Sequence, residues 1–220
     1  MLQVATSILL AFSALFPIVD PIGGSPIFLS LTRHYPVPLR RLLARRIGLN
    51  SFVLLVASFT IGSHVLSFFG LSLPVVQVGG GLVVISTGWA MLNKRDDDER
   101  GAVGRMISKA DFLKDAFYPL TLPLTVGPGS ISVAIALGAN APYPLRENLL
   151  AVGAAAIASF LIAVSVYLCY GFSDRLELII GPNGMNVIMR LTSFLLVCIG
   201  VQILWNGIST LLLSLPNKVF

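Results

Sequence analysis

One carboxyl group, that of Asp20, stands in the middle of a long apolar stretch near the start of the chain. The surrounding run is Pro17-Ile-Val-Asp20-Pro21-Ile-Gly23-Gly24-Ser25-Pro26, and its prolines and glycines disfavour an uninterrupted helix. An ionised carboxylate in such a place could bind Na⁺ or the ammonium group of a substrate, and a protonated one could carry a proton across a membrane. The alternative is a helix cap, with Asp20 accepting hydrogen bonds from the first amides of a restarted helix.

A similar run lies in the second half of the chain, in Pro119-Leu-Thr121-Leu-Pro123-Leu-Thr125-Val-Gly127-Pro128-Gly129-Ser130. Each run has two prolines four residues apart, followed by a cluster of glycine, proline and serine. Where a half-helix restarts, its free amides and its dipole favour an anionic group, and glycines let a ligand approach the main chain. The substrate-binding residues predicted on this basis are Asp20, Gly23, Gly24, Ser25, Thr125, Gly127, Gly129 and Ser130. The alternative is a pair of proline kinks packed against small residues.

A few other polar side chains lie within or beside the apolar stretches. Arg190 could form an ion pair with Asp20 and take part in coupling, or it could anchor its helix at the membrane surface. The uncharged polar residues are typical of hydrogen bonds between neighbouring membrane helices, and they are Asn50, His64, Gln77, Gln202 and Asn206.

The motifs of common catalytic and nucleotide-binding sites are absent from the sequence. It contains no His-Glu-x-x-His, Gly-x-Ser-x-Gly or Gly-x-x-x-x-Gly-Lys-Ser/Thr pattern, and its only histidines are His34 and His64. We therefore expect no enzymatic activity, no ATP site and no cofactor. Cys169 and Cys198 lie in apolar stretches without metal-ligand spacing, so no bound metal is predicted.

The composition predicts an all-α integral membrane protein. Of the 220 residues, 55% are hydrophobic and only 11% are charged, whereas soluble domains carry about 25% charged residues. A helix needs about 20 apolar residues to cross a bilayer. Such stretches occur at residues 3–32, 47–69, 74–92, 110–138, 148–171 and 185–213. The predicted fold is therefore six transmembrane helices, of which the first and fourth are broken at the two proline and glycine runs.

The matching runs divide the chain into two copies of one unit. We expect a single membrane domain, 1–220, made of a three-helix repeat at 1–93, a charged cytoplasmic loop at 94–109 and a second three-helix repeat at 110–220. Because three is odd, the second copy enters the membrane in the opposite orientation. Inverted repeats with paired broken helices are typical of secondary transporters, which hold the substrate near the bilayer midplane where the breaks meet.

The basic residues predict the orientation in the membrane. All but two of the 15 lysines and arginines fall on one side of a six-span arrangement, and the exceptions are Arg146 and Lys218. Lysine and arginine are enriched in cytoplasmic loops, so we expect both termini on the periplasmic or extracellular side. The basic residues that give the net charge of +5 are then explained as signals for orientation in the membrane, and no nucleic-acid partner is expected.

The same runs resemble a known family, the MarC proteins, which are six-span bacterial inner-membrane proteins that include small neutral amino acid transporters. The resemblance covers essentially the whole chain, and it rests on residues 16–32, 123–130, 189–191 and 202–208. It departs from the family pattern at Gly24, where Asn is frequent, and at Thr192-Ser193, where Met-Gly is frequent. The resemblance implies an amino acid carrier or exporter in the bacterial inner membrane.

Together these features predict a secondary transporter, for uptake or export of a small neutral amino acid such as glycine or alanine, coupled to protons or to sodium. Its partners would be the substrate, the coupling ion and the lipid bilayer, with a homo-oligomer as a further option. The alternative function is export of divalent cations or another small solute, for which Asp20 and His64 are the candidate metal ligands.

Overall fold

The computed structural model describes the chain except for residues 1, 34, 94–115, 119, 140–144 and 215–220. The regular structure of the described residues is helical throughout. Its elements are α1 (Leu2–Val19), α2 (Pro21–Thr32), α3 (Val37–Phe68), α4 (Leu73–Leu92), the π-helical turn η2 (Leu120–Thr125), α6 (Pro128–Ala139), α7 (Leu145–Gly171) and α8 (Ser173–Leu213). The predicted charged loop at 94–109 and the beginning of the predicted fourth span lie outside the described residues.

Among the described residues, five helical segments are long and apolar enough to cross a membrane. They are Val4–Thr32, Val37–Phe68, Leu73–Leu92, Leu150–Gly171 and Asn183–Leu213. These segments agree with five of the stretches chosen from the sequence and confirm the all-α class. The described part of the other stretch, 110–138, contains η2 and the short apolar helix α6 in place of one continuous crossing helix.

The start of the second predicted span was wrong. The apolar stretch was expected to begin at residue 47, whereas α3 begins at Val37 and includes the arginines that precede that stretch. Arginine is a good helix former, and prolines at and just after a helix start favour its first turn. Leu43, Ala44 and Ile47 are buried on one face of this extension, while Arg41 is exposed.

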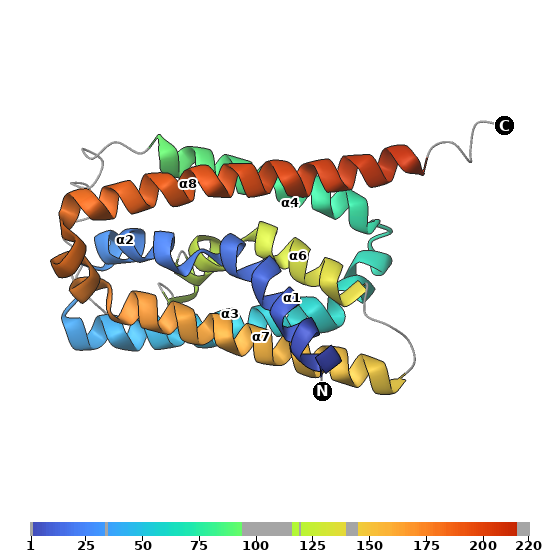
Figure 1. The fold of residues 1–220 in the computed structure, drawn as a ribbon, viewed down its shortest axis with the longest axis horizontal. Helices are drawn as coiled ribbons and strands as arrows, with labels where there is room; N and C mark the ends of the chain where they lie inside the picture. The colour runs from blue at the N-terminus through green and yellow to red at the C-terminus, as the bar shows by residue number, and fades with distance from the viewer. Residues whose placement is uncertain (1, 34, 94–115, 119, 140–144, 215–220) are drawn as a thin grey trace.

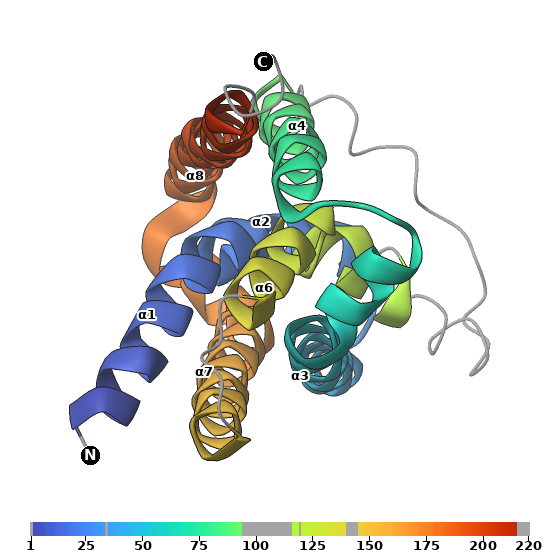
Figure 2. The ribbon, with the colours of Figure 1, turned by 90° about the vertical axis from the view of Figure 1, so that its right-hand side faces the viewer.

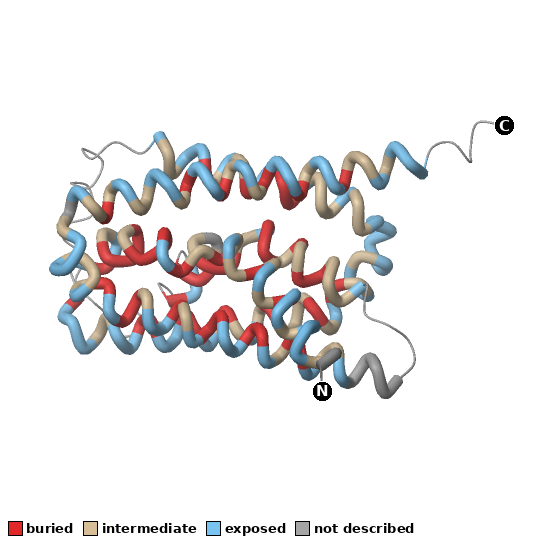
Figure 3. The backbone as a smooth tube through the Cα atoms, viewed as in Figure 1, coloured by how far each residue is buried: buried red, intermediate tan, exposed pale blue. Residues whose placement is uncertain are grey.

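The helices form two antiparallel pairs with the broken helices between them. Figures 1 and 2 show α4 beside α8 on one side, α3 and α7 on the opposite side, and α2 and α6 between the pairs. Figure 3 shows that buried residues gather on the inward faces, whereas the outward faces of the long helices are exposed. Those outward faces carry large apolar side chains such as Leu10, Val53 and Leu195, as expected of a surface that contacts lipid.

Small residues allow α4 and α8 to approach closely. A Cβ atom added to Gly81 would lie 2.8 Å from the carbonyl oxygen of Gly200, and one added to Gly88 would lie 2.9 Å from the carbonyl oxygen of Ser193. The contact nearer the start of α4 involves the residue nearer the end of α8, so the two helices are antiparallel. Glycine seams of this kind stabilise helix pairs in membranes, where apolar surface alone does not drive association.

Candidate functional site

The first helix break is centred on Asp20, whose backbone is left-handed with φ 45° and ψ 63°. Proline at the next position disfavours the helical conformation for the residue before it, and aspartate tolerates the left-handed region better than most residues. The amide of Gly23 donates to Asp20 Oδ1 over 3.0 Å, so the carboxyl caps the restarted helix α2. The cap interpretation of Asp20 is therefore confirmed.

The cap uses only one oxygen of this carboxyl group. Oδ2 of Asp20 is buried and has no hydrogen-bond partner among the described residues. A Cβ atom on Gly23 would overlap both this oxygen and the hydroxyl of Thr192 on α8, so these groups lie close together. The Thr192 hydroxyl donates instead to Ile188 O over 2.8 Å. A buried carboxylate oxygen without a partner is costly unless it binds a proton, a cation or water.

The second break begins at Leu122, where the backbone is extended with φ −109° and ψ 124°. Two threonine hydroxyls satisfy carbonyl groups beside this break, since Thr121 Oγ1 donates to Ala116 O over 2.6 Å and Thr125 Oγ1 to Leu120 O over 2.7 Å. The helix resumes as α6 at Pro128, and its first free amides belong to Gly129 and Ser130.

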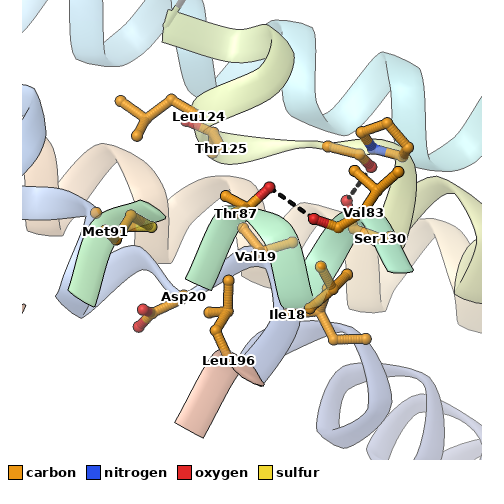
Figure 4. A pocket seen from close by; sticks show the side chains of 15 residues that line it. Ile18, Val19, Asp20, Val83, Thr87, Met91, Leu124, Thr125, Ser130 and Leu196 are labelled. Atoms are coloured by element: carbon orange, nitrogen blue, oxygen red, sulfur yellow. Dashed lines mark hydrogen bonds between the residues drawn. The ribbon is translucent and has the colours of Figure 1, made fainter. Parts of the chain in front are cut away.

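The two breaks meet around one cavity of about 40 Å³ (Figure 4). Its lining residues are Ile18, Val19, Asp20 and Gly24 near the first break, Val83, Val84, Thr87 and Met91 from α4, Leu124, Thr125, Gly127, Pro128, Gly129 and Ser130 at the second break, and Leu196 from α8. The structure thus brings Asp20, Gly24, Thr125, Gly127, Gly129 and Ser130 of the predicted set together.

Two members of the predicted set do not line this cavity. Gly23 faces Thr192 and the Asp20 carboxyl, where it leaves room for their close approach. The hydroxyl of Ser25 donates to Cys169 O over 3.0 Å and thereby attaches α2 to α7. Both residues therefore position the first break.

Arg190 and His64 also lie away from the cavity lining. Arg190 is exposed, and the ion pairs of the described residues join Arg33 to Glu177 and Arg40 to Asp174. The structure therefore does not bring Arg190 to Asp20. His64 is exposed on α3, and the described residues contain no group of three or more potential metal-ligating side chains of histidine, cysteine, aspartate or glutamate.

Tyr170 on α7 touches both breaks. Its hydroxyl lies 3.1 Å from Thr125 Oγ1, and a Cβ atom on Gly24 would overlap that hydroxyl. Because Thr125 already gives its proton to Leu120 O, Tyr170 is the donor in this pair. The Tyr170 ring stacks on Phe28 of α2 with centroids 4.7 Å apart. A side chain at position 24 would therefore collide with the Tyr170 hydroxyl, which occupies the space beside Gly24.

The wall formed by α4 was not predicted from the sequence. Val83, Thr87 and Met91 recur at helical spacing and line the cavity, but they lie in an ordinary apolar span with no proline or charge to single them out. The Thr87 hydroxyl donates to Val83 O over 2.8 Å, a bond common for threonine in any helix. The contact of Tyr170 with both breaks likewise depends on packing between segments far apart in the sequence.

Comparison with known proteins agrees with the expected family. The sequence profile described as "MarC family integral membrane protein" matches residues 5–212. The chain belongs to the MarC family. A UPF0056 membrane protein of Methanocaldococcus jannaschii is 30% identical over 206 residues, which cover 93% of this chain and 97% of that protein. The UPF0056 inner membrane protein MarC of Escherichia coli is 28% identical over 213 residues, covering 94% and 96%. No solved structure was found to match the chain.

The cavity of this MarC-family protein combines three kinds of surface. Asp20 lies at the edge of the lining with its carboxyl group beside Gly23 and Thr192, and the start of α6 supplies free amides with the positive end of a helix dipole. Ile18, Val83 and Leu196 supply apolar walls. Figure 4 shows Thr87, Thr125 and Ser130, from α4, η2 and α6, near one another, with Asp20 at the edge of this group and its carboxyl group turned away from it. Such a site suits a small solute that carries both a positive and a negative group.

Proposed function

We propose that this MarC-family protein is a secondary transporter of a small neutral amino acid such as glycine or alanine. The observation that carries the proposal is the meeting of two helix breaks, from the two halves of the chain, around one cavity that is partly charged and partly apolar. Secondary transporters commonly bind their substrates where discontinuous helices meet. The proposal includes no catalytic role for any residue.

The lining groups match the parts of an amino acid. The ammonium group would pair with the Asp20 carboxyl group at the edge of the cavity, and the carboxylate would accept from the amides of Gly129 and Ser130 at the start of α6. The hydroxyls of Thr125 and Ser130 would add hydrogen bonds. A volume of about 40 Å³ has room for about three water-sized groups. This limit favours a substrate with a very small side chain.

We further propose six membrane crossings arranged as two inverted three-helix repeats, with η2 and α6 together forming the fourth crossing. Packing between the halves supports this arrangement, because α6 lies against α3 and α4, while α2 lies against α7 and α8. Each broken helix thus contacts the second and third spans of the other repeat. The distribution of basic residues supports cytoplasmic placement of the 33–46 segment and an outer location for both termini.

Coupling is assigned to Asp20, because a proton or a sodium ion at its unpartnered Oδ2 would stabilise the buried carboxyl group. An ion gradient would then drive movement of the substrate. The ion and the substrate ammonium group would compete for the same carboxylate, so the substrate would move in exchange for the ion.

Uptake by proteoliposomes tests the proposal. Purified protein would be reconstituted, a proton or sodium gradient imposed in each direction in turn, and uptake of labelled glycine and alanine measured over liposomes without protein. We expect gradient-driven uptake by the wild-type protein and its loss in Asp20→Asn. Glu177→Gln is the matched control, because it removes an acidic group that pairs with Arg33 away from the cavity, and it should transport normally. Absence of wild-type uptake under both gradients would refute the proposed function, and normal uptake by Asp20→Asn would refute the coupling role.

A further inference from the structure

The segment between α7 and the kink of α8 forms a distinct end of the bundle. The first residues of α8, Ser173–Ile180, precede Gly181, where the backbone leaves the helical conformation with φ 76° and ψ 163°. Figure 1 shows this segment at the left end of the bundle, beyond α7 and beside the start of α3. Its two acidic side chains are already paired, Asp174 with Arg40 at 2.6 Å and Glu177 with Arg33 at 2.8 Å.

Two further arginines at this end share one aromatic ring. The guanidinium carbon of Arg41 lies 5.9 Å from the ring centroid of Phe172, and that of Arg175 lies 5.5 Å from it. Neither arginine has a carboxylate partner among the described residues. Both arginines are exposed. Their guanidinium groups contact the same Phe172 ring, and this contact neutralises neither charge. An anion is the partner that this pair lacks.

Large apolar side chains project beside these arginines. Leu178 is 85% exposed and Ile179 is 82% exposed, immediately after the charged turn of α8. Leu178 and Ile179 follow Arg175 by three and four residues and therefore lie beside it on the helix. A basic group next to exposed apolar side chains is typical of segments that lie at the boundary between headgroups and acyl chains. The apolar residues indicate lipid, and the unpaired arginines indicate that its headgroup is anionic.

We propose that Phe172–Ile180 and the start of α3 form a binding site for an anionic phospholipid. Arg41 and Arg175 bind the headgroup phosphate, to which guanidinium groups donate paired hydrogen bonds, and Leu178 and Ile179 contact the acyl chains. Charge complementarity selects phosphatidylglycerol over the zwitterionic phosphatidylcholine. This site is separate from the cavity, and the proposal does not depend on the transport function.

Thermal unfolding of the full-length protein in detergent tests the site, because a ligand that binds only the folded state raises the unfolding temperature. The protein would be titrated with phosphatidylglycerol, with phosphatidylcholine and with glycerophosphoglycerol, which has the same headgroup but no acyl chains. We expect a saturable rise with phosphatidylglycerol alone. An equal rise with phosphatidylcholine would overturn the charge selection, and an equal rise with glycerophosphoglycerol would show a site for a free phosphodiester and overturn the lipid assignment.

Substitutions locate the binding residues. Arg41→Gln with Arg175→Gln should weaken phosphatidylglycerol binding about twenty-five-fold, since each arginine near an anionic headgroup contributes about a factor of five. Arg46→Gln is the matched single-charge control for Arg41→Gln, because Arg46 is exposed on another face of α3, whereas the arginines over the Phe172 ring among the described residues are Arg41 and Arg175. Leu178→Ser with Ile179→Ser should weaken binding while both charges remain. Equal effects of Arg41→Gln and Arg46→Gln, in proteins that unfold normally without lipid, would overturn the proposal.

Discussion

Asp20 and Leu122 occupy the same position in their two runs, and the backbone leaves the helical conformation at both. Each stands three residues after one proline and directly before another. Their conformations differ, since Asp20 is left-handed with φ 45° while Leu122 is extended with φ −109°. A residue before proline is disfavoured in the helical region but can leave it in more than one direction. The shared sequence pattern therefore fixes the place of each break, and the individual residue decides its geometry.

The first prediction separates the backbone role of Asp20 from its charge. Asparagine tolerates the left-handed conformation and keeps an oxygen that can accept from the Gly23 amide, whereas alanine does neither. Asp20→Ala should therefore be less stable than Asp20→Asn by about 2 kcal/mol, from about 1 for the cap and about 1 for the left-handed backbone. Equilibrium unfolding in mixed micelles titrated with SDS measures the difference. Equal stabilities of the two variants would contradict the cap as a stabilising contact.

The second prediction concerns the approach of α6 to α4. A Cβ atom on Gly129 would overlap the side chain of Val84, so Gly129→Ala should lower the free energy of unfolding by about 1–3 kcal/mol through overpacking. Val84→Ala removes the opposing methyl groups, and the double variant should recover about 1 kcal/mol or more relative to the sum of the single effects. The double-mutant cycle is measured by the same unfolding titration.

Gly153→Ala is the control for this cycle. An added Cβ atom at Gly153 on α7 meets nothing within 4 Å, so the change should leave stability unchanged or raise it by up to about 1 kcal/mol. Additive effects of Gly129→Ala and Val84→Ala would show that the two positions are not in contact.

Much of the candidate site could be predicted because proline and glycine mark backbone breaks within otherwise apolar spans. The runs around Asp20 and Gly127 were found in this way, and both line the cavity. The opposite wall could not be found, because Val83 and Met91 look like any lipid-facing or core residues of a membrane helix. Tyr170 was missed for a related reason, since only the packing of α7 against both breaks gives its hydroxyl a role.

The fold was likewise predicted only in part. Hydropathy located five crossing segments, but it placed the start of α3 too late, because charge was used to end a span. A helix can extend beyond the apolar layer when its arginines reach the headgroup region. The first part of α3 is helical because arginine has a high intrinsic helix propensity, which hydropathy does not measure.

The third prediction tests the hydrogen bond between Tyr170 and Thr125. Tyr170→Phe removes the donor and leaves Thr125 bonded to Leu120 O, so it should cost about 1 kcal/mol. Thr125→Val leaves the Tyr170 hydroxyl buried without this acceptor and should cost about 2 kcal/mol or more, because an unsatisfied buried group carries its full desolvation penalty. The variants are compared by SDS unfolding.

The double variant provides the internal check. Tyr170→Phe added to Thr125→Val removes the orphaned hydroxyl, so the double variant should be more stable than Thr125→Val alone. If Thr125→Val is the milder single change, or if the second substitution lowers stability further, the assignment of Tyr170 as donor to Thr125 is wrong.

The fourth prediction concerns the kink in α8. Gly181 has φ 76° and ψ 163°, a region that is essentially restricted to glycine, although an added Cβ atom would meet nothing within 4 Å. Gly181→Ala should therefore lower the free energy of unfolding by about 1–3 kcal/mol through the backbone alone. Gly79→Ala on α4 is matched for open surroundings but lies within a regular helix, so it should have no effect or a small stabilising one.

Equal stability of the two variants would mean that α8 can straighten through Gly181 without cost. The kink would then not fix Ser173–Ile180 at the end of the bundle, and the ion pairs of Asp174 and Glu177 would have to hold that segment in place.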